Sequence, residues 1–322
     1  MDVANSVKQD QASARCFTGH DAVNQKVLVC GASGRLGRLV AEALRDRHAH
    51  TPRLLVRPAR LQDGWQTPQG MEPVSGDFTD TASLDAALDG VASVFLVSPV
   101  HPDMRARELA LAAAAARCPA PPQIVKISGL ATRLDSPVDS GRWHAQIEQG
   151  IRALRLPATF LRPNFFFQNL AFQVGGMRRD GILRGGVGDA AIAMVDARDI
   201  ADVAAAVLTG DTPVTGSAVA LTAGQAYTYE AVAVTFSNAL GRAVRYERQP
   251  REVLARALAA SGQPDWHVRI LRQFNEAFLA GEGSEVSTTV QQVLGRAPRN
   301  LEAYAAELAA GATPSGSDPF PS

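Results

Sequence analysis

The chain has 322 residues, and its 32 lysines and arginines balance its 32 aspartates and glutamates. Because the formal net charge is zero, no positive field recruits nucleic acid or an anionic membrane, and neither is expected as a partner. No apolar run reaches the roughly 18 residues that a membrane span needs. Three cysteines without a Cys-x-x-Cys pair favour the reducing cytoplasm.

Strand and helix patterns alternate along the first half of the chain. Short apolar runs predict strands at residues 26–30, 53–56, 73–75, 93–97, 123–128 and 158–162. Helical patterns lie between them at residues 38–47, 81–88, 104–117 and 142–155. Asp80 or Thr81 is placed to cap the second helix, and Pro163 is expected to stop the last strand. This alternation indicates an α/β fold, a doubly wound parallel sheet of the Rossmann type.

The alternation breaks after Asn169, where glycines between positions 175 and 186 predict a loop-rich segment. Further on, patterns predict helices at residues 199–208, 229–240, 251–280 (interrupted near 262–264) and 301–310, and strands at 218–221 and 244–249. We expect residues 26–168 to form a dinucleotide-binding domain. Residues 169–310 are expected to form a smaller, mainly helical substrate lobe, part of which returns to the sheet. Residues 1–25 and 311–322 are expected to be disordered.

A glycine-rich loop joins the first strand to the first helix. Gly31, Gly34 and Gly37 follow the spacing Gly-x-x-Gly-x-x-Gly, one residue longer at the start than the usual dinucleotide fingerprint. The first glycine permits a tight turn, the second lets backbone approach a pyrophosphate, and the third lets helix and strand pack closely. The helix N-terminus then offers N–H groups to phosphate. The alternative is an empty loop of an unrelated α/β protein. The loop residues expected to bind the cofactor are Gly31, Ser33, Gly34, Arg35, Leu36 and Gly37.

The end of the second strand indicates which dinucleotide binds. NAD sites place Asp or Glu there to hold the ribose 2′-hydroxyl, but this chain has Arg57. Arginine matches a phosphate through bidentate, charge-assisted hydrogen bonds, and Arg35 lies inside the glycine loop. These residues favour NADP(H) over NAD(H). Arg60, close by, is equally well explained as a solvent-facing loop charge.

Several segments together resemble the NmrA-like family of atypical short-chain dehydrogenases/reductases. They are residues 31–37, 74–80, 144–148, 161–169, 196–202 and 293–298. The resemblance, which covers roughly residues 26–310, implies a Rossmann domain and a smaller lobe that together form a substrate cleft. It also implies that Asp77 and Phe78 lie near the adenine. Other residues expected at the cofactor are Val97, Ser98, Pro163, Asn164 and Phe165.

The usual proton donor of short-chain dehydrogenases is missing. Those enzymes use Tyr-x-x-x-Lys, in which the lysine lowers the tyrosine pKa. The four tyrosines are Tyr227, Tyr229, Tyr246 and Tyr304, and none has a lysine four residues later. No lysine follows Lys126 at all. A standard alcohol dehydrogenase or nucleotide-sugar epimerase is therefore not expected.

Two other residues are candidates for catalysis. His144 precedes the sixth strand, near the place where the family or its relatives carry a functional Lys or His, and a histidine can donate a proton near neutral pH. Glu148 lies one turn later on the same helix face, where it would orient or charge the imidazole. The alternative is a surface His–Glu pair without chemistry. Ser128 ends the fifth strand. Its hydroxyl either faces the substrate or contacts the cofactor loop, or the residue only forms a turn.

The remaining chemical side chains have ordinary explanations. Aromatic residues either floor a substrate pocket or form core between the lobes; they are Phe165, Phe166, Phe167, Trp143, Trp266 and Phe274. No metal site is expected, because His48 and His50 lack further ligands at metal spacing. Cys30 is expected to be buried and unreactive. Asp196 and Asp199 favour a helix cap or a lobe contact.

The residues leave three functions open. The first is an NADPH-dependent reductase that transfers hydride to a small quinone, enone, imine or ketone. The second is a non-catalytic regulator that senses the redox state of NADP(H), because the NmrA-like family includes such proteins and the Tyr-x-x-x-Lys pair is absent. The third is an enzyme, such as an isomerase, that uses its cofactor only structurally or transiently. Neither the substrate nor the oligomeric state follows from the sequence.

Overall fold

The structure of the chain is a computed structural model that describes residues 26–211, 217–260 and 262–311. The expected disordered extension, and all of the expected tail except Gly311, lie outside these residues.

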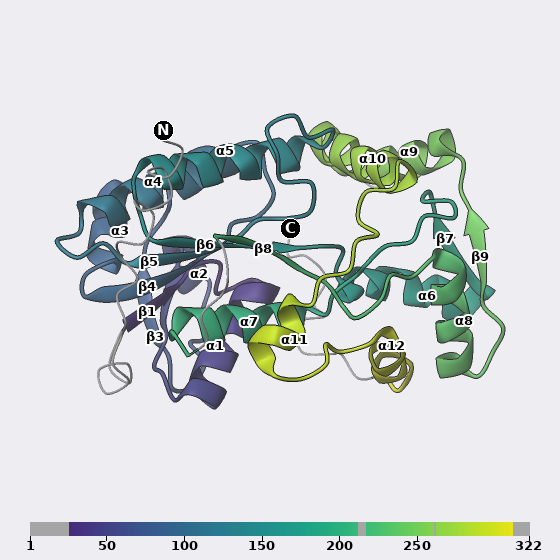
Figure 1. Cartoon of the computed structure of the whole chain (residues 1–322), viewed down its shortest axis with the longest axis horizontal. Helices are drawn as coiled ribbons and strands as arrows, with labels where there is room; N and C mark the ends of the chain where they lie inside the picture. Colours follow the sequence, from purple (N-terminus) through teal and green to yellow (C-terminus); the bar gives the residue numbers. More distant parts are fainter. Residues whose placement is uncertain (1–25, 212–216, 261, 312–322) are drawn as a thin grey trace, which may run out of the picture.

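A seven-stranded parallel sheet forms the centre of the molecule (Figure 1). In spatial order its strands are β3 (Glu72–Ser75), β2 (Arg53–Val56), β1 (Lys26–Val29), β4 (Val91–Leu96), β5 (Gln123–Ile127), β6 (Ala158–Pro163) and β8 (Ala218–Leu221). The order changes direction between β1 and β4, and doubly wound folds bind ligands beyond the carboxyl ends of the strands at such a point. The predicted Rossmann-type α/β class is confirmed.

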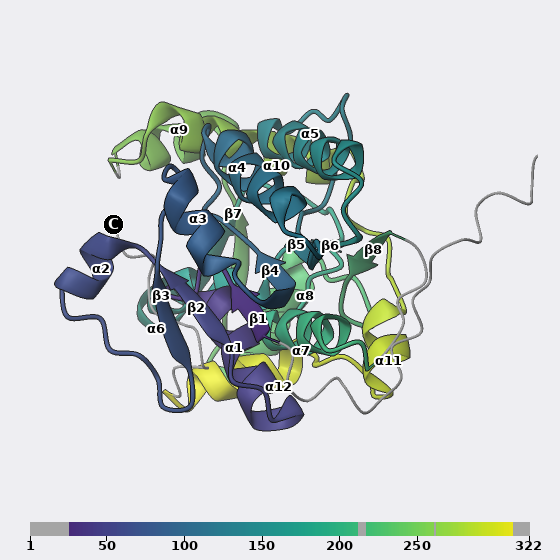
Figure 2. The same ribbon diagram turned by 90° about the vertical axis from the view of Figure 1, so that its left-hand side faces the viewer.

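Helices cover both faces of this sheet (Figures 1 and 2). One face carries α1 (Arg35–His48), α7 (Ala197–Leu208) and α11 (Thr289–Leu294); the other carries α3 (Thr81–Ala87), α4 (Met104–Arg117) and α5 (Asp139–Ala153). Asp80 caps α3, since its carboxylate accepts from the N–H groups of Ala82 and Ser83. The short helix α2 (Pro58–Gln62) was not expected from the sequence.

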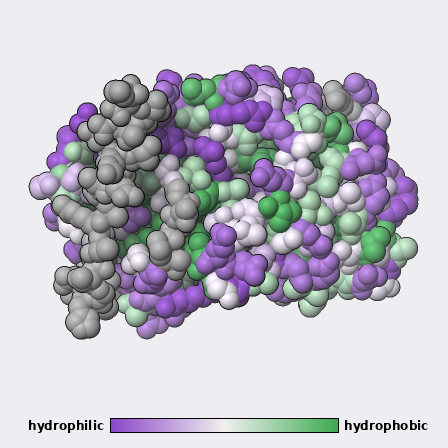
Figure 3. Space-filling view, in the orientation of Figure 1, coloured by the Kyte–Doolittle hydropathy of each residue, from purple (hydrophilic) through white to green (hydrophobic). Residues whose placement is uncertain are grey.

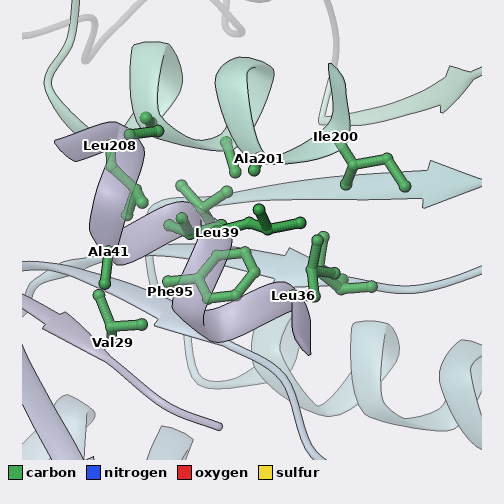
Figure 4. Packing of buried hydrophobic residues seen from close by; sticks show 14 of the residues in the cluster. Val29, Leu36, Leu39, Ala41, Phe95, Ile200, Ala201 and Leu208 are labelled. Atoms are coloured by element: carbon green, nitrogen blue, oxygen red, sulfur yellow. The ribbon is translucent and has the colours of Figure 1, made fainter. Parts of the chain in front are cut away.

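The packing of α1 against α7 and the sheet fixes the start of α1. Figure 4 shows Leu36 and Leu39 of α1 beside Ile200 of α7 and Phe95 of β4, all of them in one buried cluster. A second cluster fills the opposite side, between the sheet and α3, α4 and α5. Burial on both faces explains why the interior strands β1, β2, β4, β5 and β6 are nearly continuous apolar runs.

A third core holds the smaller lobe together at one end of the sheet. The lobe contains a 3₁₀ turn (Phe167–Leu170), α6 (Ala171–Asp180), β7 (Ile182–Gly185), α8 (Tyr229–Leu240), β9 (Arg245–Arg248), α9 (Arg251–Ala260), α10 (Asp265–Leu279) and α12 (Leu301–Ala309). The ring of Phe167 is fully buried and stacks on Tyr304 with centroids 5.8 Å apart. Strands β7 and β9 form a separate two-stranded parallel sheet.

One local prediction was wrong. The expected loop-rich segment holds α6 and β7: Gly175 and Gly176 lie inside the helix, and Gly181 ends it with a left-handed backbone at φ +65°. Burial of Met177 and pairing of β7 with β9 outweigh the low helix propensity of glycine. Strand β6 ends at Pro163, as expected, and Pro163 is itself its last paired residue, opposite Leu221.

One face of the molecule has a mixed surface (Figure 3). On the face shown in Figure 3, hydrophobic residues are scattered among hydrophilic ones. Within the described ranges, no helix has the length and apolar character needed to cross a membrane. The same residues contain no group of three or more His, Cys, Asp or Glu side chains arranged to hold a metal ion.

The packing of α1 predicts that alanine substitutions at two leucines change the free energy of unfolding by very different amounts. Leu44 of α1 is fully buried, whereas Leu134 is 57% exposed. Leu44→Ala removes buried methyl groups and leaves a cavity, so it is expected to lower the free energy of unfolding by about 2–5 kcal/mol. Leu134→Ala is the matched control and should change it by less than about 0.5 kcal/mol. Urea unfolding measures both; equal effects would contradict this view of the core.

Candidate cofactor and substrate site

The glycine loop is closed so tightly that side chains do not fit at two of its positions. Gly31 has a left-handed backbone at φ +64°, and a Cβ there would lie 2.8 Å from Cγ1 of Val97. A Cβ on Gly37 would lie 2.3 Å from the carbonyl oxygen of Gly31. The third glycine therefore lets the first turn of α1 sit directly on the loop. Val97, an expected cofactor residue, lies directly beside the turn at Gly31.

The N-terminus of α1, which begins at Arg35, has no side-chain cap. Gly34 is the N-cap and provides no side-chain hydrogen bond, and the first turn has no acidic residue. The side chain of Leu36 is buried in the core, so its contribution to a ligand is limited to its backbone N–H. Ser33 is exposed beside it. An uncapped helix start with a partial positive charge suits a phosphate group.

The ends of β2 and β3 bring a cation and an anion close together. Arg57 is exposed and is the N-cap residue of α2. Asp77 accepts hydrogen bonds from the backbone N–H and the hydroxyl of Thr79, at 2.9 and 2.7 Å. These bonds lower the pKa of Asp77, and the nearby charges of Arg57 and Arg107 lower it further. Phe78 is half-buried against the second core.

A chain of buried polar side chains runs below the carboxyl ends of β4 and β5. Ser98 donates to Oε1 of Glu108 at 2.8 Å, and Oε2 of Glu108 lies 3.1 Å from Nζ of Lys126. The same Nζ lies 2.7 Å from the carbonyl oxygen of Ile127 and 3.0 Å from Nδ1 of His144. Lys126 and Glu108 are both fully buried. Four elements that are distant in sequence are thus joined by one network.

A second buried group surrounds Ser128. Its hydroxyl donates to Oε1 of Glu148 at 2.7 Å. Glu148 is 1% exposed, and both of its oxygens accept from the guanidinium of Arg162, at 3.0 and 2.6 Å. Arg152, one helical turn later, lies 3.2 Å from Oε2. A carboxylate held by two guanidinium groups is a charge-assisted arrangement, so the proton of Ser128 is committed to the protein.

His144 is hydrogen-bonded to Lys126 and not to Glu148, the partner that the sequence predicted. The residue is 8% exposed, and burial holds its pKa well below the ordinary 6.5, with Lys126 and Arg162 lowering it further. His144 and Glu148 share the sheet-facing side of α5, but no hydrogen bond joins them within the described residues; Glu148 serves Ser128 and Arg162 instead. The imidazole is therefore neutral, and it is neither oriented nor charged by Glu148.

The segment around Gly283, which follows α10 and is here called the strap, is hydrogen-bonded to the residue that follows β6. Both ends of the Asn164 amide are hydrogen-bonded: Nδ2 donates to the carbonyl of Gly283 at 2.7 Å, and Oδ1 accepts from the N–H of Phe165. Ala193 N–H donates to the same carbonyl at 2.7 Å. The ring of Phe165 contacts Phe278 of α10 edge to face. These contacts place α10 and the strap beside the residues that follow Pro163.

The other candidate side chains serve as structure. All four tyrosines belong to the third core or its edge, and Trp143, Trp266 and Phe274 surround a small fourth cluster between α5 and α10. Asp196 caps α7, and Asp199 accepts from Arg296 and Arg299 ahead of α12. His48 pairs with Asp211. Cys30 is buried, which raises the pKa of its thiol.

Sequence reasoning missed three residues of this site: Lys126, Glu108 and Arg162. The only signals were a lysine inside the apolar run of β5 and a glutamate inside an alanine-rich helix. A charged residue in a buried strand needs a partner, but the partner comes from an element that no sequence pattern identifies.

Comparison with known proteins gives a consistent result along most of the chain. The sequence profile of the NmrA-like family matches residues 23–305. The (4-alkanoyl-5-oxo-2,5-dihydrofuran-3-yl)methyl phosphate reductase of Streptomyces griseus is 37% identical over 287 residues, 88% of this chain and 98% of that protein. The NAD(P)H azoreductase of Xenophilus azovorans is 31% identical over 288 residues, 88% of this chain and 98% of that protein.

A solved structure agrees with these relatives. The NADPH-dependent quinone oxidoreductase of Escherichia coli, in complex with NADPH, superposes with a TM-score of 0.76 at 25% identity, over 88% of this chain and 99% of that one. Family profile, relatives and fold all point the same way, and the chain belongs to the NmrA-like family.

Proposed function

We propose that this protein is an NADPH-dependent reductase that adds hydride to a small organic acceptor whose reacting double bond is conjugated to a carbonyl, as in an enone. The observation that carries the proposal is the glycine loop: Gly31 and Gly37 leave no room for side chains, and α1 starts without a polar cap. This cradle fits a pyrophosphate. Arg57 at the end of β2, in place of an acid, fits the 2′-phosphate of NADP(H).

The acceptor class follows from what the site lacks and what its relatives do. Ketone reduction relies on a strong proton donor, usually tyrosine beside lysine, and the described tyrosines are instead packed in or against the third core. The Streptomyces relative is named for a substrate whose ring double bond is conjugated to carbonyl groups. The others are named for an azo bond and for quinones, which are also conjugated acceptors. We therefore place enones ahead of quinones, imines and simple ketones.

The residues of the chain supply binding and charge stabilisation. When bound, the nicotinamide supplies the hydride that adds to the β-carbon of the acceptor. Negative charge then develops on the acceptor's carbonyl oxygen, which calls for a fixed hydrogen-bond donor. His144, buried and neutral, is the donor we assign. A proton from solvent completes the reduction at the α-carbon.

Ser128, unlike His144, can only accept a hydrogen bond from a ligand. Its O–H already donates a hydrogen bond to Glu148, so only the lone pairs of its oxygen are available. We infer that Ser128 accepts a hydrogen bond from cofactor or substrate and does not protonate either. Phe165, half-buried against Phe278 and next to Asn164, offers an apolar surface near the same strand ends.

A panel of acceptors tests the proposed function. Purified protein is mixed with NADPH and with cyclic enones, quinones, azo dyes, imines and ketones, and NADPH absorbance is followed while NADPH binding is titrated separately. We expect consumption with enones fastest and with simple ketones slowest. Tight binding without consumption of NADPH by any acceptor would favour a redox-sensing regulator and reject the reductase.

Gly37→Ala tests the cradle. Its methyl group would lie 2.3 Å from the carbonyl of Gly31, so the loop must open. NADPH affinity is expected to fall by about 10-fold or more, the value of a lost charge-assisted hydrogen bond. Gly175→Ala is the matched control: it is also helical, nothing lies within 4 Å of its Cβ, and NADPH binding should not change. Wild-type affinity in Gly37→Ala would contradict the assigned cradle.

Arg57→Ala tests the choice of cofactor. Loss of a guanidinium that binds the 2′-phosphate should weaken NADPH binding about 10- to 100-fold and leave NADH binding almost unchanged. Arg117→Ala, which removes an exposed arginine paired with Asp85 at the end of α4, serves as control and should affect neither. Calorimetric titration measures all four affinities. An equal loss for both cofactors would reject Arg57 as the phosphate ligand.

His144→Ala tests the assigned donor. Removing one preorganised donor is expected to lower kcat by about 10²-fold and to preserve NADPH affinity. Because the ring is already neutral, wild-type kcat should show no histidine titration between about pH 6 and 8. His48→Ala, in the exposed pair with Asp211, should leave kcat unchanged. Unaltered turnover in His144→Ala would return this histidine to a packing role.

A further inference from the structure

Lys126 is held by two hydrogen-bond partners and one counter-charge. An ammonium carries three donors and no acceptor. Three acceptors surround Nζ: the carbonyl of Ile127 at 2.7 Å, Nδ1 of His144 at 3.0 Å and the carboxylate of Glu108 at 3.1 Å. Lys126 and Glu108 are each fully buried. A buried carboxylate without a counter-charge is very costly, so the ion pair keeps Lys126 in its ammonium form.

The ammonium decides where the single proton of the imidazole resides. A neutral histidine has one N–H and one lone pair. Nδ1 faces an ammonium, which can only donate, so Nδ1 must hold the lone pair and Nε2 must hold the proton. An uncharged lysine would permit the reverse tautomer, but it would leave Glu108 as an unpaired buried anion.

The protonated edge of the ring lies at the end of β5. A Cβ on Gly129 would be 3.7 Å from Cδ2 and 3.8 Å from Nε2 of His144. Gly129 follows Ser128 at the carboxyl end of β5, where a doubly wound sheet receives its ligands. No residue in the described ranges accepts a hydrogen bond from Nε2, in contrast to the committed Nδ1. The absence of a side chain at Gly129 leaves room beside this edge.

We infer that Lys126 is a positioning residue: the Glu108–Lys126 pair locks His144 into the Nε2–H tautomer and presents a fixed, neutral hydrogen-bond donor at the end of β5. The part of this inference that concerns the substrate rests on the proposed function, whereas the tautomer does not. Ser98 supports the pair from the other side, through its hydrogen bond to Glu108. Fixing the tautomer of a histidine through a second group is a strong effect in other enzymes.

The test is nitrogen NMR on protein labelled with ¹⁵N in its histidines. The His144 signals are identified by their loss in His144→Ala, and one- and two-bond couplings report which ring nitrogen carries the proton. We expect wild-type His144 to have an unprotonated Nδ1 and a protonated Nε2, without cofactor or substrate present. A proton on Nδ1 in the wild-type protein would overturn the inference.

Two variants separate positioning from folding. Lys126→Met with Glu108→Gln removes both charges together, so neither is left buried alone, and it is expected to mix the two tautomers of His144. Its kcat should fall by at least about 10-fold, because a mis-set tautomer costs turnover, while the KM for NADPH stays the same. Lys26→Met, the control, changes an exposed lysine of β1 and should alter neither the tautomer of His144 nor kcat. An unchanged Nε2–H tautomer in the double variant would reject Lys126 as the cause.

The outcomes distinguish this inference from the proposed function. If no acceptor oxidises NADPH but wild-type His144 is the Nε2–H tautomer, the reductase fails and the positioning role of Lys126 stands. If turnover occurs and the proton lies on Nδ1, the reductase stands and the positioning role fails.

Discussion

A lysine buried without any exposed surface is the constraint on which the active end of this sheet depends. Lys126 lies near the carboxyl end of the interior strand β5, and a buried ammonium there is tolerated only if its charge and its N–H donors have partners. Satisfying them requires Glu108 of α4 and His144 of α5 to lie in fixed positions over β5. The same requirement aligns the two helices with the strand ends, so that one buried charge sets the geometry of both Ser98 and His144.

On the opposite face of the sheet, the constraint is the position of the N-terminus of α1. There the ligand is expected to bring the charge, and the protein supplies backbone. Close contact of Gly37 with Gly31, maintained by the packing of α1 on α7, holds the uncapped helix start in place. The α5 side of the strand ends therefore contains the buried network around Lys126, and the α1 side leaves its N–H groups for a phosphate. This division matches a site in which cofactor and acceptor are held by separate means.

Much of the fold followed from local pattern, and the exceptions have physical causes. The interior strands β1, β2, β4, β5 and β6 are buried on both faces, so they appear as apolar runs. Strand β2 and helix α4 begin and end where the patterns placed them. The glycine loop carried its own geometric requirement at Gly31 and Gly37. Helix α6 and strand β7 were missed because they are stabilised by Met177 and by pairing with β9, partners that a local window does not contain.

The candidate site was predictable only where a motif encodes backbone geometry. Arg57 and the glycines follow from spacing, and so does the presence of His144 on a helix beside the sheet. The network of Ser98, Glu108 and Lys126 joins residues up to 28 positions apart, and its pairing is created by the fold. Similarly, Asn164 was expected at the cofactor, but its amide is engaged with Gly283 and Phe165. The role of each expected cofactor residue stays a prediction.

In the proposed reaction, a hydride from NADPH reaches the β-carbon of a conjugated double bond. The direct measurement is a single turnover with NADPH deuterated at carbon four of the nicotinamide and a cyclic enone as acceptor, followed by proton and deuterium NMR of the product. We predict one deuterium on the β-carbon, an intact carbonyl group and a solvent-derived proton on the α-carbon. Deuterium on a newly formed carbinol carbon, or none in any product while NADPH stays bound, would contradict this reaction.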